Sequence, residues 1–238
     1  HLMEVTEQKN SALVERLFKA GAHFAFSRAR RHPSASPFIF GAKQRVEIFD
    51  LEKTSGALER AKSFASALAK EGKSILFVGG KPESQKIVKA AAERIGMPYV
   101  SGRWIGGTLT NFPEIKKRIT KLEELRSARE TGGLSKYTKL ERLMIDRDIT
   151  RLENSFGGVV SIKDGLPSAL FVVDARREHI ALAEAKALGI PVVALASSDN
   201  DLGKITFPIP ANDTAVESIS VIVDEIASAY ASGRSTKA

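Results

Sequence analysis

The chain has 238 residues, 43% hydrophobic and 27% charged, which is typical of a folded globular protein. It contains no cysteine, so disulfides, thiolate zinc sites and thiol nucleophiles are excluded, and its apolar runs are too short to cross a bilayer. The formal net charge of +8 favours a polyanionic partner, and the polar start predicts no cleavable signal peptide.

The first informative segment, residues 21–46, is basic and contains no carboxylate. Its five cations are Arg28, Arg30, Arg31, Lys43 and Arg45. It also holds four aromatic residues, for which core packing is the expected role: Phe24, Phe26, Phe38 and Phe40. Because arginine binds RNA phosphates bidentately and stacks on bases, the segment is a candidate RNA contact. A solvated basic surface without a nucleic-acid partner is the alternative.

Short β-branched runs alternate with longer helical patterns, which predicts a parallel sheet flanked by helices. The predicted strands are residues 46–49, 74–78, 99–100, 169–173 and 192–195. The runs at 75–78 and 170–173 are apolar on both faces, so these strands should be central. Right-handed crossovers then give an α/β fold with a doubly wound sheet.

Apolar residues at three- and four-residue spacing predict helices over residues 54–70, 83–95, 177–188 and 213–230. In the third of these helices, the spacing predicts a buried stripe formed by Ile180, Ala183, Ala187 and Leu188. Gly189 and Pro191 supply the signal that ends this helix.

Residues 113–156 lack a strand pattern and contain two amphipathic runs separated by residues 131–135. Their apolar positions, from Ile115 to Leu122 and from Ile145 to Phe156, predict the seam of an antiparallel coiled-coil hairpin. Charges around most of each helix, Lys116 and Lys117 among them, favour an arm that projects from the protein. The predicted α/β domain therefore comprises residues 1–112 and 157–238, with the hairpin 113–156 inserted.

Two glycine-containing turns follow predicted strands, where doubly wound sheets bind ligands. Residues 79–84 fit neither G-x-G-x-x-G nor G-x-x-x-x-G-K-[ST], and Pro82 removes an amide donor. Residues 103–111 read "RWIGGTLTN", and a sharp turn before the hairpin accounts for the glycines there. It accounts less well for Arg103, so Arg103 and its neighbour Trp104 are candidate RNA contacts.

Catalytic signals are weak. His23 and His32 have no carboxylate nearby in sequence, and no Ser-His-Asp order, H-E-x-x-H or nucleophile elbow is present. The residues favour a binding protein. One alternative is a nucleotide- or sugar-phosphate-binding α/β enzyme that uses the strand ends near Gly79 and Gly106. Another is a protein-docking module whose partner surface is residues 199–230, where six carboxylates accompany one lysine.

Ordered motifs across nearly the whole chain resemble the bacterial small-subunit ribosomal protein two family, also called the universal ribosomal protein two family. They are GAHF (21–24), PFIFG (37–41), ILFVG (75–79), RWIGGTLTN (103–111), FGG (156–158), LPSALFVVD (166–174), LGIPV (188–192) and PIPAND (208–213). The resemblance implies a flavodoxin-like sheet of about five strands with a protruding coiled-coil hairpin. It implies no catalysis, no cofactor and no small-molecule substrate.

The resemblance also implies a structural role in translation, in the small (30S) ribosomal subunit of the cytoplasm, with no membrane association. The implied partners are small-subunit ribosomal RNA and neighbouring ribosomal proteins. In many bacteria the member of this family also helps to dock ribosomal protein one. The RNA-binding residues expected here are Arg28, Arg30, Arg31, Lys43, Arg45, Arg103, Trp104, Lys116 and Lys117.

The chain departs from the family pattern at positions that bear on RNA and metal binding. Where the family commonly reads G-V-H-F-G-H, Phe26 replaces the second histidine, so RNA contacts are expected to shift toward the neighbouring arginines. Some members hold a divalent metal with a histidine and several aspartates. This chain keeps His23 and Asp213 but has Ser197 and Thr214 where aspartates are expected, so we predict no tight metal site.

Overall fold

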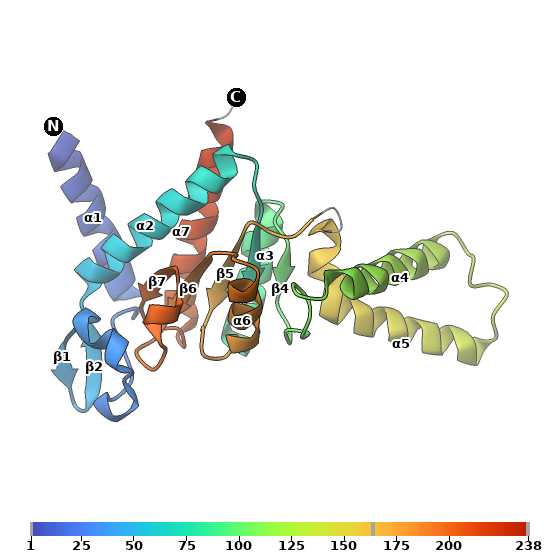
Figure 1. The fold of residues 1–238 in the computed structure, drawn as a ribbon, viewed down its shortest axis with the longest axis horizontal. Helices are drawn as coiled ribbons and strands as arrows, with labels where there is room; N and C mark the ends of the chain where they lie inside the picture. Colours follow the sequence, from blue (N-terminus) through green and yellow to red (C-terminus); the bar gives the residue numbers. More distant parts are fainter. Residues whose placement is uncertain (1, 163–164, 237–238) are drawn as a thin grey trace.

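The computed structural model describes residues 2–162 and 165–236. Its centre is a five-stranded parallel sheet in the order β4-β3-β5-β6-β7. The strands are β3 (Ile75–Val78), β4 (Tyr99–Val100), β5 (Ala169–Val173), β6 (Val192–Ala196) and β7 (Phe207–Pro210). Numbered within the sheet, this order is 2-1-3-4-5, the flavodoxin-like arrangement. The predicted doubly wound α/β fold is therefore confirmed (Figure 1).

Helices cover both faces of the sheet and bury its side chains in two cores. On one face, Phe77 and Phe171 pack in a core with α1 (Leu2–Lys19), α2 (Leu51–Lys70), α3 (Pro82–Arg94) and α7 (Val216–Ser235). On the other face, Leu76 and Leu170 pack with α6 (His179–Ala187) and the base of the helical hairpin. The central strands β3 and β5 are buried along their whole length, as a strand covered on both faces must be.

The strand at residues 46–49 does not belong to this sheet, so that part of the prediction is wrong. It is β2 (Val46–Phe49), and it pairs antiparallel with β1 (Ile39–Lys43) in a separate hairpin. Gln44 and Arg45 form the turn with positive φ angles of 50° and 70°, which matches the right-handed twist of the paired strands. An alternating apolar run cannot by itself distinguish a hairpin strand from a sheet strand.

The fifth sheet strand is β7, which the strand pattern does not predict. Its prolines, Pro208 and Pro210, lack an N–H donor and fit only at a sheet edge. β7 is an edge strand and pairs only with β6. The buried hydroxyl of Thr54 on α2 donates to the carbonyl oxygen of Pro210 at 2.6 Å, so this edge is covered.

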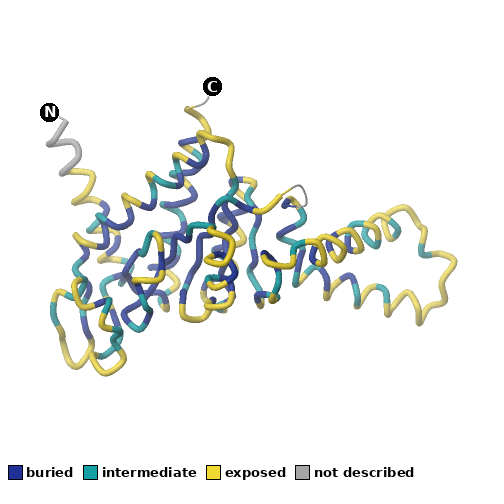
Figure 2. Tube along the Cα trace, in the orientation of Figure 1, coloured by how far each residue is buried: buried dark blue, intermediate teal, exposed yellow. Residues whose placement is uncertain are grey.

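The segment between β4 and β5 contains an antiparallel helix pair that extends along the long axis of the molecule (Figure 1). Its helices are α4 (Phe112–Glu130) and α5 (Lys139–Phe156), and Ile119, Leu122 and Ile149 are fully buried between them. Burial decreases toward the far end of the pair (Figure 2). Among the described residues, no helix is long and apolar enough to cross a lipid bilayer.

The buried side of α6 also differs from the prediction. Ile180 and Leu188 are 47% and 43% exposed, and the predicted stripe with Ala183 and Ala187 faces solvent. The residues that face the core are Ala181, Glu184 and Ala185. The helix is rotated relative to its apolar pattern because its glutamate is buried against a loop, as described below.

Candidate nucleic-acid interface

A buried carboxylate gathers arginines where the sheet strands end. Asp199 follows β6, and its side chain is only 8% exposed. It accepts hydrogen bonds from Arg30 at 3.3 Å and from Arg176 at 3.0 Å. The Arg30 guanidinium also lies 3.9 Å from the centre of the Phe26 ring, a cation–π contact that fixes its orientation. Two exposed guanidinium groups are thus held side by side by one carboxylate.

Two further arginines flank this pair in the chain. Arg28 belongs to the short helix η1 (Arg28–Arg30), and Arg177 follows Arg176. Both are exposed, and neither forms an ion pair within residues 2–162 and 165–236. We call Arg28, Arg30, Arg176 and Arg177 the arginine cluster. Asp199 balances Arg30 and Arg176 in part and the charge of Glu178 acts on Arg177, so four cations face two carboxylates and the cluster is positively charged at the edge where doubly wound sheets bind ligands.

Sequence reasoning did not identify Arg176 and Arg177 as site residues. The available signal was their position, because they follow the central strand β5 almost directly. The contact between residues 28–30 and the β6 end was not visible in the sequence. It depends on links such as the His32 amide, which donates to the Ser198 carbonyl at 2.8 Å.

The β1–β2 hairpin carries the second group of predicted cations. Lys43 and Arg45 lie at its turn, exposed and without an ion pair in the described part of the chain. Phe40 on β1 is 80% exposed and Phe24 is 48% exposed, so the expected core packing of these two rings is wrong. Phe40 and the two cations belong to the same hairpin, and exposed rings together with free cations are the groups that stack on bases and bind phosphates.

The other predicted RNA contacts differ in how free their side chains are. Arg103 and Lys116 are exposed and form no ion pair with any described residue. Lys117 pairs with Glu114 at 2.6 Å on the surface. Arg31 is mostly covered and pairs at 2.8 Å with buried Glu47, so it serves the fold. The β1–β2 hairpin and α4 lie toward opposite ends of the molecule, so the predicted cations do not form one patch (Figure 1).

The loop "RWIGGTLTN" is filled by a side chain of the protein itself. One carboxylate oxygen of Glu184 accepts hydrogen bonds from the Gly107 amide at 2.7 Å and the Trp104 indole at 3.2 Å. The other accepts from the amides of Leu109 and Thr110 at 2.9 and 3.2 Å. The loop thus forms an anion-binding nest that is occupied by Glu184 and unavailable to a phosphate. Trp104 is 6% exposed and braces this loop, which leaves no ring face for a base.

The turn after β3 is filled in the same way. The Gly80 amide donates to buried Glu178 at 2.9 Å. The ammonium of Lys81 lies 2.8 Å from Asp174 and 3.1 Å from Asp213, and only 12% of the lysine side chain is exposed. These groups occupy the crevice between β3 and β5, the topological switch point at which related folds bind small molecules. Protein side chains therefore fill both turns that the enzyme alternative requires.

The single ammonium of Lys81 lies between two carboxylates, those of Asp174 and Asp213, and this changes the acidity of Asp213. Burial, and then the neighbouring charge of Asp174, raise the pKa of Asp213 from 3.8 to about 7. The folded protein therefore holds this proton more tightly than the unfolded chain does. The contribution of Asp213 to stability is full below pH 3.8 and is lost as the pH rises to about 7.

Replacing Asp213 with asparagine should remove this pH dependence. Between about pH 5 and pH 7, the slope of unfolding free energy against pH should differ between wild type and Asp213→Asn by up to about 1.4 kcal/mol per pH unit. Urea unfolding at several pH values measures both slopes. Parallel slopes would show that Asp213 does not titrate in this range.

The residues do not fit the metal site that the family resemblance suggests. The His23 ring packs against Phe18 and Phe24, with ring centres 4.5 and 4.2 Å away. Asp213 is engaged by Lys81 and by the Ser197 amide at 3.1 Å. No group of three or more His, Cys, Asp or Glu side chains within residues 2–162 and 165–236 is placed to hold a metal ion. Lys81 supplies the positive charge in this crevice.

The acidic segment 199–230 does not form a free acidic surface. Asp224 pairs with Arg94 at 3.3 Å, and Glu225 accepts from Arg16 at 2.6 Å and pairs with Lys62 at 2.8 Å. Asp199 and Asp213 are engaged as described above. Internal cations thus neutralise most of these carboxylates, which weakens the interpretation of this segment as an acidic docking surface.

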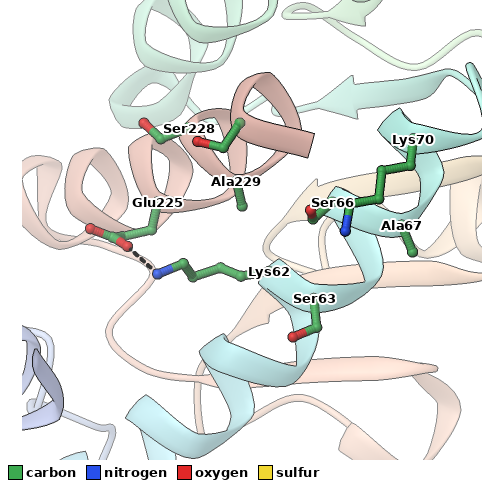
Figure 3. Close-up of a pocket in the computed structure, with 9 residues that line it drawn as sticks. Lys62, Ser63, Ser66, Ala67, Lys70, Glu225, Ser228 and Ala229 are labelled. Carbon is green, nitrogen blue, oxygen red and sulfur yellow. Dashed lines mark ion pairs between the residues drawn. The ribbon is translucent and has the colours of Figure 1, made fainter. Parts of the chain in front are cut away.

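A groove of about 500 Å³ lies between α2 and α7 (Figure 3). Small residues line most of it, with Ser63, Ser66 and Ser228 among them. The ion pair between Lys62 and Glu225 closes one side, and the two charges balance. Lys70 adds one exposed positive charge to the lining, and the described lining residues do not form a set of groups suited to catalysis.

Comparison with known proteins agrees with this architecture. Residues 17–233 match the family described as Ribosomal protein S2. "Small ribosomal subunit protein uS2" of a Nitratiruptor species is 44% identical over 92% of this chain and 81% of its own length. The proteins of the same name from Coprothermobacter proteolyticus and Mycobacteroides abscessus are 43% and 40% identical over 93% and 92% of the chain, and over 82% and 79% of their own lengths. The chain therefore belongs to the Ribosomal protein S2 family, whose members are structural proteins of the ribosome and not enzymes.

Proposed function

We propose that this protein binds small-subunit ribosomal RNA through two basic surfaces joined by the sheet. The first comprises the arginine cluster and the turn of the β1–β2 hairpin. The second comprises Arg103 and the first turns of α4, with Lys116 and Lys117. Neighbouring small-subunit proteins are further partners, and docking of ribosomal protein one stays a prediction.

The observation that carries this proposal is the arrangement around Asp199. A single buried carboxylate holds Arg30 and Arg176 at 3.3 and 3.0 Å, and their near neighbours in the chain, Arg28 and Arg177, are exposed. Holding two arginines together costs repulsion, and a bound phosphate backbone would remove that cost. Fixed guanidinium groups also lose little side-chain entropy on binding, which favours recognition of a folded RNA.

We expect RNA affinity to fall steeply with salt, because each neutralised phosphate contributes about −0.7 to −0.9 to the slope of log affinity against log salt. Replacing Arg28 and Arg177 together with alanine should make this slope shallower by about one per arginine. Filter binding of small-subunit ribosomal RNA between about 50 and 200 mM salt measures this change.

Arg60→Ala is the matched control, since Arg60 is exposed on α2 and forms no ion pair with a described residue. It removes one positive charge at a distance from the proposed surface and should leave the salt slope unchanged. A flat salt dependence of the wild type, or an equal change in the control, would rule out the proposed surface.

A further inference from the structure

Helix α5 carries a second apolar stripe in addition to the one that faces α4. Leu140, Leu143 and Met144 are 67%, 47% and 62% exposed. Their spacing places them on one side of the helix, opposite the seam residues Ile149 and Leu152. Figure 2 shows this end of α5 exposed over consecutive turns. We call Leu140, Leu143 and Met144 the outer stripe.

The same side of α5 continues toward the sheet without a carboxylate. Helical spacing adds Arg147, Thr150, Arg151 and Asn154 to this side. Arg147 is exposed and has no ion pair within the described chain, and Arg151 pairs with Asp148 at its flank at 3.1 Å. The surface is therefore apolar near the tip of the hairpin and positively charged next to it.

The chemistry of the outer stripe favours a protein over RNA. Aliphatic side chains cannot donate hydrogen bonds to phosphates or to base edges, and they do not stack as aromatic rings do. Adjacent exposed leucine and methionine side chains on one helix typically mark a protein-interaction site. Apolar anchors at i, i+3 and i+4 are the pattern by which helices recognise one another.

We propose that the outer stripe docks an amphipathic helix of a neighbouring small-subunit protein, with apolar residues against the stripe and carboxylates facing Arg147. The proposal rests on membership of the ribosomal family and not on the arginine cluster. Arg147 is exposed and has no ion pair in the described chain, and this free positive charge next to the outer stripe selects an acidic partner helix over a basic one.

The first test places a photo-cross-linking amino acid at Leu143 in purified small subunits. The expected product is an adduct with another ribosomal protein that survives ribonuclease digestion. The control position is Arg142, which is exposed and lies on another side of α5 from the outer stripe. An adduct with ribosomal RNA, an adduct between two copies of this chain, or no adduct at Leu143 would each overturn the proposal.

The second test measures binding to small subunits depleted of this protein. Changing the outer stripe to serine should weaken binding at least about tenfold, as expected when interface anchors are truncated. Changing Arg142 to serine, in the same turn but on another side of α5, should have little effect. Arg147→Glu should weaken binding more than Arg147→Lys if the partner is acidic, and equal effects would overturn that assignment.

Stability and RNA affinity separate the possible causes of a negative result. The outer stripe is exposed, so its serine variant should melt at the wild-type temperature. Its salt-dependent affinity for isolated ribosomal RNA should be unchanged as well. If the variant with Arg28 and Arg177 changed to alanine loses RNA binding while Leu143 still gives its protein adduct, both proposals are supported. If that variant binds RNA normally, only the proposed RNA surface is rejected.

Discussion

Replacing Glu184 with alanine should lower the free energy of unfolding by about 3–5 kcal/mol, because it leaves several buried donors without an acceptor. The carboxylate, on a residue that is 8% exposed, accepts three backbone N–H groups and the Trp104 indole N–H. Water could satisfy these donors only if the loop opened. Urea unfolding followed by circular dichroism measures the loss, and Trp104 fluorescence reports on the loop.

The control for this variant is Lys186→Ala on the exposed side of α6, which should change stability by less than about 0.5 kcal/mol. Burial alone would raise the pKa of Glu184, but the donors from Gly107, Leu109 and Trp104 outweigh it and hold the pKa below 4.5. The stabilisation is therefore present above this pH and is lost as the pH falls through the folded pKa. Equal stabilities of the Glu184 and Lys186 variants would contradict the account of the loop.

Replacing Lys81 with methionine should destabilise the protein by about 3–5 kcal/mol, because removing one partner of a buried ion pair leaves uncompensated charge. Asp213 is 1% exposed and its pKa is already raised to about 7, so without the ammonium this carboxyl would have to take up a proton at pH 7, while Asp174 would lose its partner. Methionine preserves most of the lysine volume, so the loss should be electrostatic. Thermal and urea unfolding at pH 7 measure it.

Two further variants separate electrostatics from packing at Lys81. Lys89→Met removes an exposed lysine from the same helix and should have little effect, since its side chain is 53% exposed. Combining Lys81→Met with Asp213→Asn should restore part of the lost stability, because asparagine is neutral without having to take up a proton on folding. A double variant no more stable than Lys81→Met would mean that packing dominates at this position.

The sequence predicts those parts of the fold in which the apolar pattern is the main determinant. The runs at β3 and β5 identify the central strands because only a strand covered on both faces is continuously apolar. The stepping of Ile119 and Leu122 identifies one side of the helix pair for the same reason, since those residues are fully buried.

Features decided by polar contacts between distant residues could not be predicted. The two prolines of β7 are untypical of a strand, so the sequence pattern does not predict it. β7 forms because it pairs with β6 and because the Pro210 carbonyl oxygen accepts a hydrogen bond from Thr54. The rotation of α6 follows from Glu184, whose donors lie 74 to 80 residues away in sequence. The arginine cluster depends on Asp199, which is 169 residues from Arg30. In each case a tertiary hydrogen bond overrides the local pattern.

The most direct test of the account is to cross-link positions 28 and 177 in purified small subunits that contain this protein. A photo-cross-linking amino acid at either position should give adducts with small-subunit ribosomal RNA that are destroyed by ribonuclease. The same group at Arg60 should give no such adduct. Adducts only with protein at positions 28 and 177, or RNA adducts at Arg60 alone, would contradict the proposed RNA surface.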